Sequence, residues 1–162
     1  TAVDADTYTL VVTPTANTNA GTITVDVAAS VAIDAASNPN TIATQATQAY
    51  DTLAPSVTIT DDEAAATANI AGGTILYTFT FSQAVTGFTV GDVVVTGGTK
   101  AGAFASGADG SSVYTLAVTP TANTNAGTIT VDVAANVASD AAGNTAPTRT
   151  IEIRILRRLI MA

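Results

Sequence analysis

The sequence predicts an all-β fold, specifically a β-sandwich, on the basis of three observations. Alanine, threonine and valine dominate the composition, and the last two pack well on a pleated sheet but crowd a helix. Segments such as TILYTFTF alternate polar and apolar residues with the period of a strand. Two nearly identical segments lie about one hundred residues apart, which indicates a repeat the size of a whole domain.

The repeat is the strongest of these signals. Residues 8–38 read YTLVVTPTANTNAGTITVDVAASVAIDAASN and residues 114–144 read YTLAVTPTANTNAGTITVDVAANVASDAAGN, so 27 of 31 aligned positions are identical. The offset of 106 residues is too long for a solenoid coil and fits a sandwich domain. We therefore expect the C-terminal half of a preceding repeat at 1–50, a complete repeat at 51–155, and a basic and apolar tail outside the repeat at 156–162.

The complete repeat contains about seven short alternating segments separated by turn residues, as expected of a sandwich. We predict its strands at 56–60, 74–82, 87–90, 93–97, 113–119, 127–134 and 148–155. The alternation assigns the core to Val57, Ile59, Ile75, Tyr77, Phe79, Phe81, Phe88, Tyr114, Leu116, Val118, Ile129, Val131 and Val133. Just before the tail, Ile151, Ile153 and Ile155 extend the last strand. The alternative is that the basic segment RILRRLI is an amphipathic surface-binding segment.

The N-terminal half-repeat predicts three strands, at 7–13, 21–28 and 41–48. Its apolar face has no partner sheet in this chain and consists of Tyr8, Leu10, Val12, Ile23, Val25 and Val27. Three strands with open edges and one uncovered face are marginal alone and prone to pair with another molecule. We expect either a poorly packed half-domain or a strand-exchanged dimer.

Composition excludes several function classes. The net charge is −8, and residues 1–148 contain twelve acidic residues and a single basic residue, Lys100. Such a negative chain repels phosphate groups, so nucleic acid is not an expected partner. Without cysteine or histidine the chain cannot form disulfides, thiolate zinc sites or a Ser-His-Asp triad. No apolar run is long enough to span a membrane. The adjacent carboxylates of Asp61 and Asp62 point apart rather than into a pocket, so we do not expect an enzyme.

The sequence resembles a known family at several motifs. TILYTFTFSQAVTGF, the GDVVV segment, the strand YTLAVTP and the closing loop DAAGN resemble the bacterial immunoglobulin-like repeats of giant adhesins and biofilm-associated surface proteins. The resemblance covers about residues 55–150 and, in part, 1–50; Ser37 departs from it where the second copy has Gly143. It implies an immunoglobulin-like sandwich, a location at the bacterial cell surface or outside the cell, a stalk function and calcium at domain junctions.

Calcium takes six to eight oxygen ligands, so its site needs several acidic and amide side chains gathered by loops. We expect a junction site from Asp51, Asp140 and Asn144, with Asp34 and Asn38 as its earlier copy. The acidic turn Asp61, Asp62 and Glu63 lies at the opposite end of the repeat, so the chain holds two half-sites and no complete one. The alternative is that these residues form turns through their own hydrogen bonds.

The predicted function is that of a spacer or stalk repeat whose partners are the neighbouring repeats of its own chain. Host or matrix glycans or proteins would bind through other domains. The rival prediction is a carbohydrate- or protein-binding adhesive module. Sugar sites present exposed aromatic rings, and only Tyr50 looks free here, whereas near-identical repeats suit a function based on length.

Overall fold

The computed structural model describes residues 6–63, 67–68, 73–124 and 126–156. The chain divides into two compact units, Thr1–Leu53 and Ala54–Ala162, and each is described by itself. Within the described residues no helix is long and apolar enough to cross a membrane. The tail predicted at 156–162 lies outside the described residues except for Leu156.

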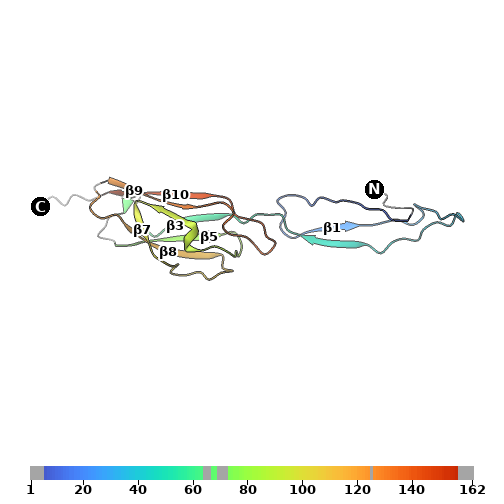
Figure 1. Cartoon of the computed structure of the whole chain (residues 1–162), viewed down its shortest axis with the longest axis horizontal. Helices are drawn as coiled ribbons and strands as arrows, with labels where there is room; N and C mark the ends of the chain where they lie inside the picture. The colour runs from blue at the N-terminus through green and yellow to red at the C-terminus, as the bar shows by residue number, and fades with distance from the viewer. Residues whose placement is uncertain (1–5, 64–66, 69–72, 125, 157–162) are drawn as a thin grey trace. The chain divides into compact units, whose positions relative to one another are not determined.

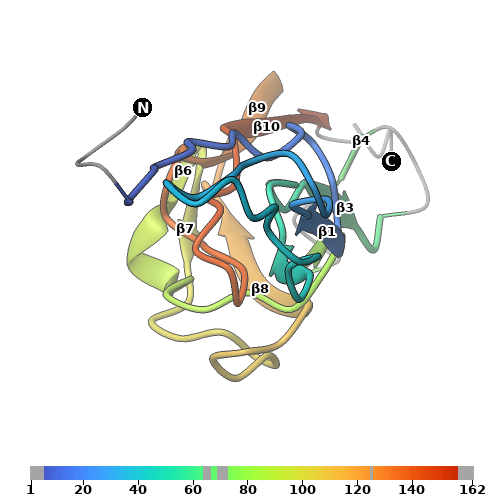
Figure 2. The same cartoon turned by 90° about the vertical axis from the view of Figure 1, so that its right-hand side faces the viewer.

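The second unit is built from two sheets (Figures 1 and 2). One sheet has the order β3-β5-β8-β7 and consists of β3 (Val57–Asp61), β5 (Ile75–Phe81), β8 (Val113–Pro120) and β7 (Gly98–Lys100). The other has the order β4-β10-β9-β6 and consists of β4 (Thr67–Ala68), β10 (Arg149–Leu156), β9 (Ala126–Val133) and β6 (Val93–Thr96). The pairings are antiparallel except that of β4 with β10.

This strand order is that of an immunoglobulin sandwich. If β3, β5, β6, β7, β8, β9 and β10 are lettered A to G, one sheet reads A-B-E-D and the other G-F-C, with β4 added beside G. The predicted fold class, an all-β immunoglobulin-like β-sandwich, is therefore confirmed.

The core lies between the two sheets. All thirteen residues assigned to it from the alternation pattern are buried, and Val85, Val93, Ala138 and Ala146 join them. Four aromatic rings pack edge to face at its centre, with Phe88 5.1 Å from Tyr114 and from Phe81 and 5.6 Å from Phe79 between ring centroids. Such contacts stabilise the core beyond the buried area alone.

The prediction of a strand at 87–90 is wrong. Its last residue instead begins a short 3-10 helix, η2 (Val90–Asp92). The backbone N–H and the hydroxyl of Thr89 both donate to Asp92 Oδ2, at 2.8 and 2.7 Å. This local capping turns the chain before a sheet ladder can form. The alternation pattern does not predict β4 and β7, because these strands have two and three residues and are too short to show alternation.

The first unit has one two-stranded sheet among its described residues, formed by β1 (Gly21–Val25) and β2 (Ala46–Tyr50) in antiparallel register (Figure 1). The strand predicted at 41–48 thus begins later and ends at Tyr50. The strand predicted at 7–13 is wrong, since only Tyr8 forms an isolated bridge there. Its counterpart β8 is held between β5 and β7, and residues 6–53 contain no equivalent of either strand.

The two copies of the repeated segment differ sharply in burial. Tyr8 and Leu10 are 75% and 74% exposed, whereas their counterparts Tyr114 and Leu116 are 1% and 0% exposed. Val12 and Val27 are also exposed, and Ile23 and Val25 are half-buried. The apolar face expected to lack a partner sheet is therefore uncovered.

Candidate functional site

The loop after β9 carries Asp140 and Asn144, the first pair of predicted calcium ligands. Asp140 Oδ1 accepts hydrogen bonds from the backbone N–H groups of Ala142 and Asn144, both at 2.9 Å. Its Oδ2 accepts from Asn144 Nδ2 at 3.0 Å and from Gln83 Nε2 at 2.8 Å. The buried carboxylate is thus the centre of a closed turn, and a calcium ion would compete with four N–H donors for its lone pairs.

The earlier copy repeats this geometry on the first unit. Asp34 Oδ1 accepts from the backbone N–H groups of Ala36 and Asn38, at 2.9 and 2.8 Å, and Oδ2 accepts from Asn38 Nδ2 at 3.0 Å. Ser37 adopts a left-handed φ of 66° where Gly143 has 88°. The same short sequence therefore builds the same turn with or without a covering sheet, because the turn is held by its own hydrogen bonds.

Both aspartates are held in the ionised form. The side-chain and backbone donors of Asn38 lower the pKa of Asp34. For Asp140, burial raises the pKa, but hydrogen bonds from the side chain and backbone of Asn144 and the backbone of Ala142 outweigh it and leave the pKa below its ordinary value. These carboxylates are therefore suited to holding loop geometry and are unsuited to acid catalysis near neutral pH.

The acidic turn lies at the other end of β3 from Gln83 and the Asp140 loop, as expected. Val57, at the start of β3, pairs with Phe81, and Asp61, at its end, pairs with Tyr77. Asp61 Oδ1 accepts from the backbone N–H of Glu63 at 3.0 Å, and Asp62 Oδ1 accepts from the backbone N–H of Leu76 at 2.8 Å.

The Tyr77 hydroxyl lies in the core near this turn. It is fully buried and has no hydrogen-bond partner among the residues that the structure describes. Burial, and then the negative charges of Asp61, Glu63 and Asp62, raise the pKa of Tyr77. The phenol is therefore neutral across the physiological range.

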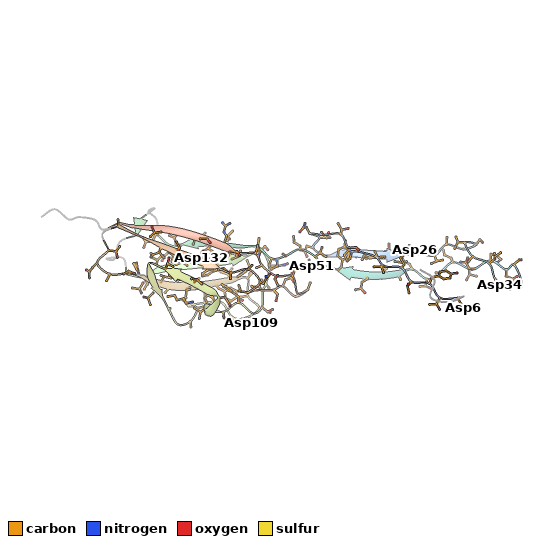
Figure 3. All side chains as sticks on the ribbon, turned by 45° about the horizontal axis from the view of Figure 1, so that its top comes forward. Asp6, Asp26, Asp34, Asp51, Asp109 and Asp132 are labelled. Carbon is orange, nitrogen blue, oxygen red and sulfur yellow. The ribbon has the colours of Figure 1, made fainter. Side chains whose placement is uncertain are left out.

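Asp51, the remaining predicted ligand, belongs to the first unit, where its Oδ1 accepts from the backbone N–H of Leu53 at 2.8 Å. Within that unit Asp34 and Asp51 lie at opposite ends (Figure 3). Among the described residues no three acidic side chains are grouped closely enough to hold a metal ion.

Two polar residues that sequence reasoning missed also fix loops of the second unit. Gln83 reaches Asp140 from 57 positions away along the chain, and no sequence pattern signals that contact. Lys100 donates from Nζ to the carbonyls of Val90, at 2.7 Å, and of Val93, and so ties β7 to the start of the other sheet. The sequence signal for a structural role of Lys100 is that it is the one basic residue among twelve acidic residues in residues 1–148.

A family model described as a bacterial Ig-like domain matches residues 51–155. The chain belongs to this family. No curated protein and no solved structure matches it. The resemblance to bacterial immunoglobulin-like repeats is thus confirmed for residues 51–155, and bacterial Ig-like domains are structural modules rather than a typical enzyme family.

Most aromatic side chains of this bacterial Ig-like chain are buried or half-buried. The expectation that Tyr50 is free is wrong: its half-buried ring covers Gly21, where an added Cβ would lie 2.6 Å from Tyr50 Cε1. Of the other rings, only Tyr8 is exposed, since Phe104 is half-buried and the remaining five are buried. The exposed ring of Tyr8 belongs to the uncovered face of the first unit.

Proposed function

We propose that the chain is a spacer repeat in the stalk of a bacterial cell-surface or secreted adhesin. The observation that carries this proposal is the match between two lengths. Near-identical segments recur at an offset of 106 residues, and the bacterial Ig-like match spans 105 residues, from 51 to 155. Successive domains therefore follow one another with almost no intervening chain, so that each repeat adds a fixed length.

The surface chemistry supports a passive role. The chain carries thirteen acidic residues against five basic ones, and the described rings other than Tyr8 contribute to packing. A negative, ring-poor surface keeps a long array soluble and repels anionic surfaces. The proposal therefore assigns no catalysis to this chain and leaves attachment to other domains of the same adhesin.

Calcium at the junctions between repeats is the second part of the proposal. The turn Asp61–Glu63 places three consecutive carboxylates at one end of the sandwich, and calcium prefers such oxygen ligands. Further ligands would come from the adjoining repeat, for which the entry residue Asp51 and the Asp140 loop are the candidates. Bound calcium would then fix the angle between repeats and make the stalk stiff.

Small-angle scattering on a polypeptide of three repeats tests the spacer function, with calcium present and after chelation. The proposal predicts a rod in calcium that loosens after chelation. A compact particle, together with binding on a glycan array, would support the rival adhesive module instead.

Thermal melting of two full repeats isolates the calcium part. Calcium should raise the melting temperature, and the triple variant Asp61→Asn, Asp62→Asn, Glu63→Gln should abolish that rise. A melting temperature that calcium leaves unchanged removes the calcium sites and leaves the spacer function standing.

A further inference from the structure

The strand β6 forms one edge of the second unit, inside the bacterial Ig-like match of residues 51–155. Its sheet has the order β4-β10-β9-β6, so β9 pairs with one side of β6, and no strand of the described chain pairs with the other. The sequence of β6 is VVVT, which is rich in the β-branched residues that sheets favour, and Val94 is 55% exposed. An edge strand of this kind can add a strand from another molecule.

The backbone of Val93 shows which groups of β6 face the open side. Its N–H donates to the Val90 carbonyl, and its carbonyl accepts from Lys100 Nζ, so both groups point away from β9. Residues of an antiparallel pair alternate between hydrogen-bonded and non-hydrogen-bonded positions, so Val95 faces the open side as Val93 does. An added strand would therefore pair with the backbone groups of these two residues.

The crossing of the chain between the two sheets places Lys100 at this edge. The chain leaves β6, takes a left-handed φ of 74° at Gly97, and enters β7 in the other sheet. The two strands lie side by side (Figure 2). From β7 the half-buried Lys100 reaches back and donates through Nζ to the carbonyls of Val90, at 2.7 Å, and of Val93.

The ammonium group of Lys100 opposes strand addition in two ways. It has three donors and no acceptor, and it occupies the Val93 carbonyl that the N–H of an incoming strand would need. A strand added here would also take the charge out of water, which is costly for an ion. The one basic residue of residues 1–148 thus lies at the open edge of the sheet.

We propose that Lys100 is a guard residue that keeps β6 from pairing with β6 of a second copy of the repeat. The partner that it excludes is the same edge, because two identical edges can pair antiparallel about a two-fold axis. A tandem array increases this hazard, since near-identical neighbours are held at high local concentration. The guard acts on each folded repeat and depends neither on the spacer function nor on calcium.

Sedimentation of the 162-residue chain over a range of concentrations tests the guard. Lys100→Met keeps an apolar stem of similar length but removes the charge and the donors, and should raise the association constant by roughly tenfold or more. Lys100→Arg keeps the charge and the donors and should associate no more than the wild-type chain. Thr99→Met puts the same side chain on the adjacent exposed residue of β7 and should also match the wild-type chain.

Amide hydrogen exchange locates the association on the chain. In Lys100→Met the Val95 amide should exchange more slowly at high than at low protein concentration, because its N–H then pairs with the second copy. Val94→Lys, added to Lys100→Met, returns a charge to the edge and should restore the wild-type association constant. Circular dichroism checks the fold. If Lys100→Met unfolds the chain, Lys100→Gln, which loses the charge but keeps a donor, takes its place and should associate likewise.

Three results would overturn the proposal. The first is association of Lys100→Met and Lys100→Gln that is no stronger than that of the wild-type chain. The second is association of Lys100→Met that is equalled by Lys100→Arg or by Thr99→Met. The third is stronger association without slower exchange at Val95, because the contact between copies would then lie elsewhere on the chain.

Discussion

The phenol of Tyr114 donates a hydrogen bond to the backbone carbonyl of Val85 across 3.2 Å, in the buried centre of the sandwich. The ring also packs against Phe88 and Phe104, with centroids 5.1 and 5.2 Å apart. One side chain of β8 therefore fixes the loop after β5 as well as the aromatic core. Its duplicate, Tyr8, has none of this packing, so the repeat supplies a matched control within the same molecule.

Removing only the hydroxyl should separate the hydrogen bond from the packing. Tyr114→Phe leaves the Val85 carbonyl without this donor and should cost about 1 kcal/mol of the free energy of unfolding of the second unit. Tyr8→Phe should change it by less than the error of the measurement. Urea unfolding followed by circular dichroism checks both, and equal effects of the two variants would contradict the assigned hydrogen bond.

Truncation of equivalent leucines should show the same asymmetry on a larger scale. Leu116→Ala creates a cavity opposite Tyr77 in a fully buried layer, and should cost about 2–5 kcal/mol. Leu10→Ala removes an exposed side chain and should leave the unfolding of the second unit unchanged. A large loss of unfolding free energy in Leu10→Ala would show that the Leu10 side chain is packed against a partner.

The stability of the second unit should depend on pH through Asp140. The pKa of Asp140 in the fold lies below the ordinary value of 3.8, so its ionised form contributes stability that is complete above pH 3.8 and is lost as the pH falls through the folded-state pKa. Asp140→Asn places an amide where Gln83 and Asn144 already present donors, and should cost on the order of 1–2 kcal/mol at pH 7.

The same experiment has an internal check. The difference between the wild-type chain and Asp140→Asn should shrink in acid below pH 3.8, as measured by urea unfolding across pH 2–7. Asp34→Asn, in the equivalent exposed turn, should not affect the second unit at any pH. A difference that is independent of pH would assign the loss to shape rather than to the charge of Asp140.

Gly97 should be intolerant of any side chain. It has a left-handed φ of 74°, and an added Cβ would press on the Thr128 carbonyl, 3.0 Å from its carbon and 3.3 Å from Ile129 Cα. Gly97→Ala should therefore cost more than the roughly 1 kcal/mol of backbone strain expected for Gly110→Ala. Gly110 has a φ of 86°, and no described atom lies within 4 Å of its added Cβ. Thermal melting of the two variants gives the comparison, and equal shifts would contradict the close approach.

The core could be predicted from sequence because alternation is a direct consequence of the strand period. Ile75, Tyr77, Phe79 and Phe81 are all buried, as the pattern of TILYTFTF indicated. The alternation pattern gave a wrong prediction where a nearby side chain, rather than a neighbouring strand, bound the backbone. At Thr89 the carboxylate three residues later binds the backbone and starts η2 instead of a strand.

A strand also needs a neighbour that the local pattern cannot report. Residues 7–13 alternate as residues 113–119 do, yet the structure has a strand only in the second copy, where β5 and β7 supply the ladder. The turns containing Asp34 and Asp140 were foreseen as an alternative to calcium because their bonds are local. The bond from Gln83 could not be foreseen, since only the fold brings it to Asp140.

Hydrogen exchange on a lengthened chain tests most directly whether the two copies are corresponding halves of sandwiches in series. A copy of residues 54–107 is placed ahead of Thr1, and amide exchange is compared at residues 8–27 and 114–133. We predict that the first segment exchanges fast in the 162-residue chain and acquires the slow exchange of the second segment in the lengthened chain. If residues 8–27 still exchange fast with that half-repeat in front of them, the account of serial sandwiches is contradicted.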